Sequence, residues 1–201
     1  MLRKGLLVLL LVALVGVGSV FGEEGGAANA AALDIAPLFR GFALSESDLH
    51  LSGFGFGAYY ERQMNDKWTL GAKMTFFTHK LNISVSGFGI EEKDTLFSLG
   101  ILSRYYPNNM MDKFFFGFGV GFDRITFYES EFWPGGSDSF SQTFSGLNLH
   151  VNTGYRIFFN DNIFIEPLFG YKISKFGMLY NDEGLSGLSG FHIDLSIGYK
   201  F

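Results

Sequence analysis

The sequence predicts an all-β fold, a closed, eight-stranded, antiparallel up-and-down transmembrane β-barrel. Three observations predict this architecture. Large apolar residues occupy every second position in eight successive segments, which is the period of a β-strand. Short and long connections alternate between the segments, as in a meander of hairpins. The chain of 201 residues is rich in residues typical of such barrels, with 27 Gly, 25 Phe, 9 Tyr and 2 Trp.

The composition excludes several other classes of protein. Cysteine is absent, so disulfides, thiolate metal sites and a lipid-modified cysteine are excluded. The net charge of −5 falls to −7 without Arg3 and Lys4, because 13 basic residues then face 20 acidic ones, and nucleic acid is therefore not an expected partner. After residue 22 no apolar run approaches the roughly 18 residues that a membrane helix requires.

The first 22 residues have the plan of a secretory signal peptide. Two basic residues precede an apolar stretch from Leu6 to Val15, and small residues and two glutamates follow it. Cleavage after Gly22 or after Ala30 fits the small-residue rule, whereas an uncleaved anchor would be too short to span a bilayer well. We expect a signal peptide at 1–22, a linker at 23–32 and a barrel at 33–201.

The eight alternating segments define two faces for each expected strand. They are residues 33–44, 49–64, 68–85, 95–106, 114–128, 143–158, 163–179 and 189–201. In the sixth segment Leu147, Leu149 and Val151 share one face, and polar residues share the other. Pro37 and Pro167 fall inside segments, where each removes a backbone donor, so bulges are expected at both.

The lengths of the connections predict which ends of the strands lie together. Short turns rich in Asn and Asp follow the second, fourth and sixth segments. The remaining connections are 45–48, 86–94, 129–142 and 180–188, of which all but the first are long. Both termini are therefore expected at the end of the barrel that carries the short turns.

Three features predict that the apolar faces point outward to lipid, and not inward as in a soluble barrel of the lipocalin kind. The polar faces are rich in Gly and Ser and poor in Lys and Glu, which suits a narrow interior. Each segment has at least 12 residues, enough to cross a bilayer at a tilt. Aromatic residues of the apolar faces gather near the short turns, as an interfacial girdle does. The expected girdle is Tyr60, Trp68, Tyr105, Phe114, Tyr155, Tyr199 and Phe201.

Two motifs give a resemblance to a known family. The chain ends on Ile197-Gly198-Tyr199-Lys200-Phe201, and residues 166–171 read Glu-Pro-Leu-Phe-Gly-Tyr. With its eight segments, the mature chain resembles the small eight-stranded outer-membrane β-barrels of the OmpA/OmpX/OmpW type. The resemblance implies a place in the outer membrane of a diderm bacterium, surrounded by outer-membrane lipid. It also implies recognition by the barrel-assembly machinery through the C-terminal strand, with Tyr199 and Phe201 as the assembly signal.

Charged residues on the polar faces predict a network inside the barrel. By alternation the interior holds Asp34, Arg40, Glu61, Lys73, Arg104, Asp123, Arg156, Glu166, Lys172, Asp194 and Lys200. Unpaired charge is costly in a narrow, partly dehydrated interior, so the near balance of signs predicts an ion-paired, filled lumen. The interior glycines are expected to make room for the long Arg and Lys side chains. The alternative is a narrow channel for small or apolar solutes, which these charges would line.

No feature of the sequence predicts an enzyme. The histidines have no metal-ligand spacing, and the Gly-x-Gly stretches lack the helix that a dinucleotide site needs, so neither a metal nor a cofactor is expected. His50 and Ser52, with Glu46, form the least favoured alternative, a lipid-modifying enzyme of the outer membrane, because no acid clearly orients the histidine.

The longest connection, 129–142, is the expected contact site for an extracellular ligand. Phe132 and Trp133 lie between two glutamates and a Pro-Gly-Gly turn, so the tip combines acidic charge with a large apolar area. An aromatic anchor resting among lipid headgroups is the alternative for these residues. The sequence as a whole thus predicts a structural or surface-interaction protein.

Overall fold

The computed structural model describes residues 28–44, 50–51, 54–85, 88–108, 111, 113–176 and 187–201. These ranges contain strands and no helix. The strands are β1 (Asn29–Leu44), β2 (His50–Leu51), β3 (Phe54–Gln63), β4 (Trp68–Val85), β5 (Phe88–Tyr105), β6 (Lys113–Trp133), β7 (Gly136–Phe158), β8 (Ile163–Phe176) and β9 (Gly187–Lys200). Within the described ranges, no helical segment meets the length and apolarity that a bilayer span requires. The predicted signal peptide lies outside them.

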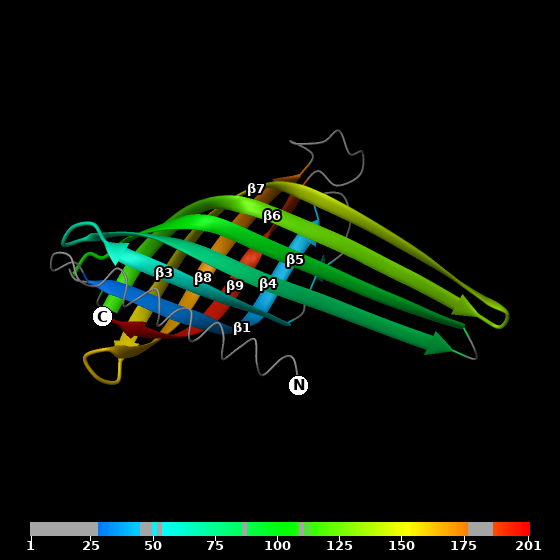
Figure 1. The fold of residues 1–201 in the computed structure, drawn as a ribbon, viewed down its shortest axis with the longest axis horizontal. Helices are drawn as coiled ribbons and strands as arrows, with labels where there is room; N and C mark the ends of the chain where they lie inside the picture. The colour runs from blue at the N-terminus through cyan, green and yellow to red at the C-terminus, as the bar shows by residue number, and fades with distance from the viewer. Residues whose placement is uncertain are drawn as a thin grey trace.

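Antiparallel pairing closes the strands into a ring, as predicted (Figure 1). Each strand from β3 to β9 pairs with its neighbour in the chain, and β1 pairs with both β3 and β9. The closing pair, β1 with β9, runs from Ala30↔Lys200 to Leu44↔Leu188. The two-residue β2 pairs only with β1, so the ring has eight members.

The two prolines inside strands behave differently. The pairing of β1 with β9 shifts register on both sides of Pro37, which confirms the bulge predicted there. The bulge predicted at Pro167 is wrong. Pairing of β7 with β8 lapses between Gly154↔Leu168 and Ile157↔Ile165 but resumes in the same register. Pro167 therefore removes a ladder hydrogen bond without inserting an extra residue.

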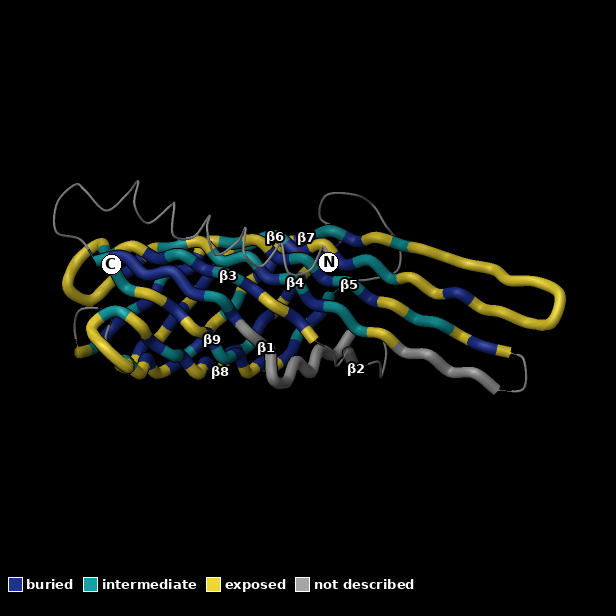
Figure 2. The backbone as a smooth tube through the Cα atoms, turned by 60° about the horizontal axis from the view of Figure 1, so that its bottom comes forward, coloured by how far each residue is buried: buried dark blue, intermediate teal, exposed yellow. Residues whose placement is uncertain are grey.

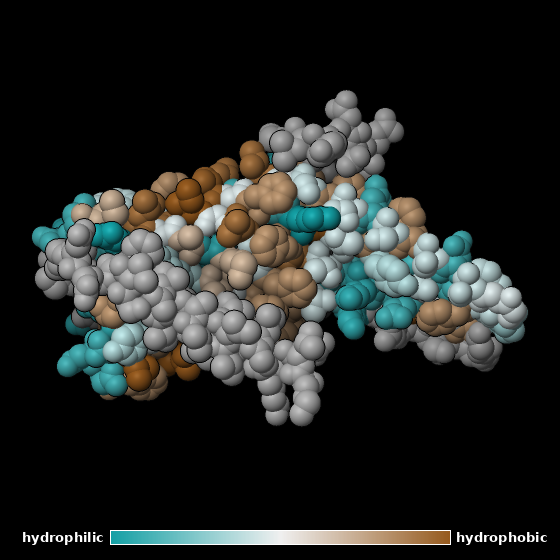
Figure 3. Space-filling view, in the orientation of Figure 1, coloured by the Kyte–Doolittle hydropathy of each residue, from teal (hydrophilic) through white to brown (hydrophobic). Residues whose placement is uncertain are grey.

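Burial alternates along the strands (Figure 2), and the exposed positions of the barrel are mostly apolar. In β7, Leu149 and Val151 are 61% and 58% exposed, whereas Asn148 before them and Asn152 after them are buried. Figure 3 shows apolar side chains over the body of the barrel and mostly polar ones at its ends. The outer surface is the one that suits lipid, and the polar surface lines the interior.

The two long connections predicted at 86–94 and 129–142 are wrong. β5 begins at Phe88, and β6 and β7 continue to a tight turn at Pro134 and Gly135. Gly135 has a φ of 108°, which L side chains rarely adopt, so glycine suits this turn. Beyond the apolar belt, acidic residues interrupt the apolar face of β5, β6 and β7, so the apolar alternation that marked the strands is weakened there. The first strand also begins at Asn29, before the predicted Leu33.

The continued strands form a four-stranded sheet that projects beyond the rest of the barrel, at the right of Figure 1. We call it the extended sheet: residues 78–85 of β4, 88–95 of β5, 126–133 of β6 and 136–143 of β7. Its first row is a line of cross-strand neighbours made of threonine alone, Thr78, Thr95, Thr126 and Thr143. Exposed Lys80 and Lys93 follow on the same outer surface. This row marks the end of the apolar belt.

Candidate functional site

Two glutamates and two arginines form an ionic cluster inside the barrel, near the short turns. Glu61 of β3, Arg104 of β5, Arg156 of β7 and Glu166 of β8 are inward-facing and at most 1% exposed. Arg104 Nη1 lies 3.5 Å from Glu61 Oε2, and its Nη2 lies 2.9 Å from Glu166 Oε1. Arg156 Nε donates a 3.0 Å hydrogen bond to Glu166 Oε2, and its Nη2 pairs with Glu61. The four charges sum to zero.

Aromatic rings enclose both guanidinium groups of this cluster. Arg104 Cζ lies 4.3 Å from the ring centroid of Tyr59 and 4.4 Å from that of Phe115. Arg156 Cζ lies 4.1 Å from the ring centroid of Phe164. Attraction between a cation and a ring face is strongest where water is excluded. Ring faces and opposite charges thus replace the water that these arginines give up.

A second group of ion pairs lies further along the interior. Lys73 Nζ lies 2.9 Å from Asp34 Oδ2 and 3.1 Å from Asp194 Oδ2. Lys172 Nζ lies 2.8 Å from Asp123 Oδ1. These pairs also receive hydrogen bonds from neutral side chains. Ser196 Oγ donates to Asp34 at 2.6 Å, Asn148 Nδ2 donates to Asp123 at 2.6 Å, and Ser174 Oγ donates to Asp123.

A small cavity of about 40 Å³ separates these polar side chains. Lys73, Lys172, His150 and His192 are among its lining residues. His150 Nε2 faces this region with no hydrogen-bond partner. A cavity of this size and polarity is large enough for water, which needs about 10–15 Å³.

The interior glycines make room for other side chains than predicted. A Cβ on Gly119 would lie 2.3 Å from His150 Cε1, and one on Gly170 would lie 2.5 Å from His192 Cε1. A Cβ on Gly198 would lie 2.2 Å from the Phe164 ring. The expectation that these glycines accommodate Arg and Lys is therefore wrong. These three glycines accommodate the rigid imidazole and phenyl rings of residues on the neighbouring strand.

Apolar side chains lie on both sides of the charged interior. At the short-turn end, the buried cluster is Ala30, Ala32, Tyr59, Tyr106, Met111, Phe115, Phe164 and Leu168. At the end that carries the extended sheet, it is Phe77, Leu96, Ile125, Phe144, Phe176 and Leu188. The first apolar cluster surrounds the Glu and Arg cluster, because its rings pack on the two guanidinium groups, and the second lies between the charged groups and the extended sheet.

The structure brings together most of the charged residues that alternation placed inside. The five predicted carboxylates, Asp34, Glu61, Asp123, Glu166 and Asp194, all take part in ion pairs with Lys73, Arg104, Arg156 or Lys172. Lys200 Nζ lies 5.7 Å from the ring centroid of Phe158. The side chain of Arg40 lies outside the described residues.

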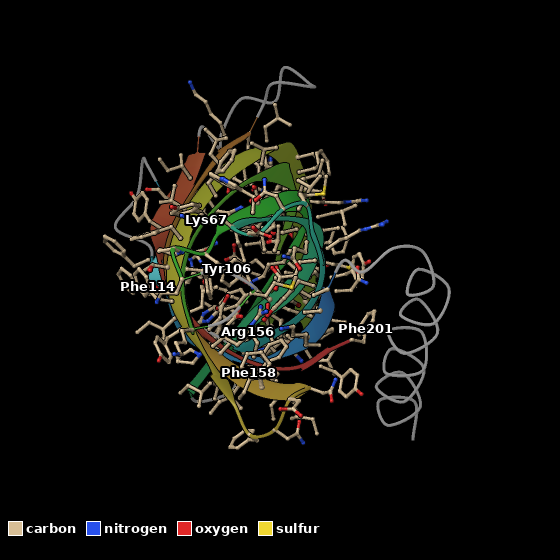
Figure 4. All side chains as sticks on the ribbon, turned by 90° about the vertical axis from the view of Figure 1, so that its left-hand side faces the viewer. Lys67, Tyr106, Phe114, Arg156, Phe158 and Phe201 are labelled. Atoms are coloured by element: carbon tan, nitrogen blue, oxygen red, sulfur yellow. The ribbon has the colours of Figure 1, made fainter. Side chains whose placement is uncertain are left out.

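The predicted girdle residues face outward. Trp68, Phe114, Tyr155 and Tyr199 are exposed, and Tyr60, Tyr105 and Phe201 are half-buried. Figure 4, a view along the barrel from the short-turn end, shows Phe114 and Phe201 outside the ring and Tyr106 and Arg156 within it. The side chains of Glu46, His50 and Ser52 lie outside the described residues, so the alternative enzyme site stays a hypothesis.

Sequence reasoning missed the neutral partners of the ion pairs. The Tyr106 hydroxyl donates to Glu61 Oε1 at 3.1 Å, and Thr69 Oγ1 donates to Glu61 Oε2 at 3.0 Å. Alternation with Glu61 would have identified Tyr59 as inward-facing. Tyr106 lies just past the end of β5, but it is the last residue of the predicted segment 95–106 and shares the face of Arg104, so alternation would have identified it too.

One titratable group of the extended sheet has an altered pKa. Asp94 faces inward beside the apolar layer, directly across from His79 in the pairing of β4 with β5. Burial raises the pKa of Asp94 to about 6; Glu92 also raises it, and His79 lowers it. This carboxyl lies beyond the apolar belt and is therefore accessible to protons from the aqueous side.

Solved structures of outer-membrane proteins share this arrangement of strands. Ail, the attachment invasion locus protein of Yersinia pestis, in complex with the heparin analogue sucrose octasulfate, has a TM-score of 0.62 and 14% identity, covering 88% of this chain and 100% of that chain. Neisserial surface protein A has a TM-score of 0.54 and 14% identity, with the same coverage. The fold is that of the small outer-membrane β-barrels. No family model and no curated protein matches the sequence of this barrel.

Breaking the ionic cluster of this barrel should lower its stability sharply. Arg156→Met leaves buried carboxylates without their closest cation, and we expect the free energy of unfolding to fall by about 3–5 kcal/mol. Arg124→Met, at an exposed position on the same barrel, should change it by less than about 0.5 kcal/mol. Urea unfolding in lipid vesicles, followed by the heat-modifiable gel shift, measures both. Equal losses in the two variants would contradict the assigned role of the cluster.

Asp94→Asn should stabilise the barrel at high pH alone. A folded pKa near 6 lies above the unfolded value of about 3.9, so the folded state binds this proton more tightly, and stability falls as the pH rises between the two values. We expect the variant to unfold at higher urea than the parent at pH 8, with the advantage disappearing toward pH 4. Asp161→Asn, at an exposed site in a short turn, is the control. An advantage that is independent of pH would point to packing.

Proposed function

We propose that this chain is an integral outer-membrane protein with a structural or surface-interaction role and no enzymatic activity. The apolar outer belt, the closed ring of strands and the likeness in fold to outer-membrane barrels support this proposal. The surrounding outer-membrane lipid would contact the belt, and the girdle aromatics would lie at the headgroups near the short turns. The terminal strand, with Tyr199 and Phe201, would carry the signal for the barrel-assembly machinery.

We further propose that the signal peptide is cleaved after Gly22 and not after Ala30. Asn29 and Ala30 belong to β1, and Asn29 N donates a 2.8 Å hydrogen bond to Phe201 O. Ala30 is fully buried. Cleavage after Ala30 would remove two residues that help to close the ring.

We propose that the lumen is filled and does not conduct. Its support is the packing along the axis: an apolar cluster that surrounds the Glu and Arg cluster near the short turns, then the Lys and Asp pairs, and a second apolar cluster toward the extended sheet. An ion would have to break buried ion pairs and pass both apolar clusters, which is energetically costly. The cavity between the clusters supports the second candidate, a narrow channel, but its volume of about 40 Å³ is small for a solute path.

The extended sheet is the observation that carries the surface role. Its strands project past the apolar belt, and within the described residues no strand pairs with β4 beyond Thr78 or with β7 before Gly146. Among the described residues, both edges of the sheet are therefore unpaired, and unpaired edges accept further strands. Ail, which shares the fold, has been solved with a heparin analogue. We propose that this chain likewise binds an extracellular ligand through this region.

Phe132 and Trp133, the predicted contact residues, are the last two residues of β6 and are both 41% exposed. Neighbouring residues of a strand face opposite sides, so Phe132 lies on the outer face of the sheet and Trp133 on the inner face. Trp133 stands across from Gly136, where a Cβ would lie 3.1 Å from the indole. A single partner surface would therefore contact one of them, not both.

Labelling of intact cells tests the surface role. Because the chain has no cysteine, Ser137→Cys at the tip of the extended sheet and Asp161→Cys in a short turn each provide a single thiol. We expect a membrane-impermeant maleimide to label residue 137 in intact cells and residue 161 only after the outer membrane is permeabilised. Labelling of residue 137 only after permeabilisation would overturn the proposed orientation.

Planar-bilayer recordings distinguish a filled lumen from a channel. We expect the purified, heat-modifiable protein to show no steady ohmic conductance, because the charged layers are paired and both ends are apolar. A conductance that scales with salt concentration would favour the channel. In that case Lys172→Gln, a change in the cavity lining, should alter the ion selectivity, whereas Lys80→Gln on the outer surface should not.

A further inference from the structure

The inner face of the extended sheet carries large apolar side chains that are exposed. This face continues the barrel interior outward, beyond the apolar layer that contains Phe77 and Phe144. On it Phe88 and Phe140 are 61% and 60% exposed, Trp133 is 41% exposed, and Ile90 is 37% exposed. Exposed apolar area of this kind, rimmed by polar groups, is typical of a site that binds another molecule.

The same face is acidic. Glu92 stands directly across from Glu129, and Glu131 stands directly across from Asp138. Like charges at directly opposed positions of neighbouring strands destabilise a sheet. Asp94 adds a fifth carboxylate to this face, beside Glu92. Repulsion between these carboxylates lowers the stability of the sheet, and a cation from a partner would offset that repulsion.

His79 lies on this face across from Asp94, but no Lys or Arg among the described residues of the extended sheet does. Among the described residues of the extended sheet, Lys80 and Lys93 belong to the opposite, outer face, as alternation requires. In the sequence, residues 45–53 and 177–186 contain four acidic residues and no Lys or Arg. A positively charged partner or free counterions would therefore neutralise these carboxylates.

We propose that the inner face of the extended sheet is the docking site for a cationic, amphipathic polypeptide segment, one that presents Lys or Arg together with large apolar side chains. Its cations would pair with Glu129, Glu131 and Asp138, and its apolar residues would cover Trp133 and Phe140. Acidic and apolar groups are interleaved on this face, since Glu129 stands across from Phe140 and Glu131 across from Ile90. This interleaving favours a partner with alternating character over a simple polycation. The inference rests on the proposed surface role and names the chemistry of the partner.

Tryptophan fluorescence provides a local measurement of docking. The chain has two tryptophans, and Trp68→Phe leaves Trp133 as a single reporter on the inner face. The protein in phosphatidylcholine nanodiscs is titrated with a synthetic peptide that alternates Lys with Leu and Phe. We expect a saturable change in Trp133 emission that weakens with added salt, because exposed ion pairs are screened. Empty nanodiscs and the same peptide with Glu in place of Lys are the controls for binding to lipid and for charge.

Matched variants assign the site within the sheet. Glu129→Gln with Glu131→Gln should raise the Kd of the peptide by about tenfold, and Phe140→Ser should also raise it. Lys80→Gln with Lys93→Gln, the same change of charge on the outer face, should leave the Kd unchanged or lower it. Each variant is first shown to fold by its heat-modifiable gel shift.

Several outcomes would overturn the inference. An unchanged Kd in the glutamate variant, equal binding of the Glu-containing peptide, or the same Trp133 response to calcium chloride alone would each do so; the last would assign the carboxylates to a metal ion. Labelling at residue 137 in intact cells without peptide binding would leave the surface role standing and remove only the assigned partner. Peptide binding in nanodiscs without labelling would instead remove the surface role and leave the docking site.

Discussion

The pairing of β1 with β9 satisfies the backbone of the first and last strands, and the rest of the structure depends on it. In a lipid environment an unpaired N–H or C=O group costs several kcal/mol, so a sheet is stable there only if it has no edges. This pair extends along both strands, from Ala30 to Leu44 on β1, in spite of the register shifts beside Pro37. Once the ring is closed, every residue of a strand faces either lipid or the narrow interior.

The narrow interior then dictates what its side chains do. Charged groups that cannot reach water must find partners across the axis, and they find them on distant parts of the chain. Glu61 and Arg156 are 95 positions apart in the sequence. Glycines opposite rigid rings keep the strands close, and aromatic faces cover the guanidinium groups of Arg104 and Arg156. The charged side chains, the aromatic rings and the glycines therefore pack against one another in the interior.

The extended sheet is free of these constraints, because it lies beyond the belt where closure is required. Its two faces consequently differ from those of the barrel. The outer face carries the threonine row and the lysines, and the inner face carries carboxylates and exposed rings. Opposed like charges persist here although they weaken the sheet. The extended sheet does not have to be compatible with lipid. Its surfaces can therefore carry the side chains that a binding site needs.

The sequence alone determined the faces of the strands. Apolar alternation placed Leu149 outside and Asn148 inside, and it placed all five interior carboxylates on the correct side, because a period of two maps directly onto the two sides of a sheet. It also predicted the eight-membered ring from the even number of segments. Alternation carries no information where both sides of a strand meet water, and for this reason residues 129–133 and 136–142 were predicted as a connection although they are strand.

Only the tertiary structure decided which residues meet. Alternation placed Glu166 and Lys172 on the same side of one strand, but Glu166 pairs with arginines of β5 and β7, and Lys172 pairs with Asp123 of β6. These partners depend on the tilt and stagger of strands around a closed ring, which no single segment records. The opposition of Glu92 and Glu129, like that of Glu131 and Asp138, likewise follows from register between strands. The sequence by itself determined the side on which each residue lies, and the closed ring decided its neighbours, because height and register around a barrel are properties of all the strands together.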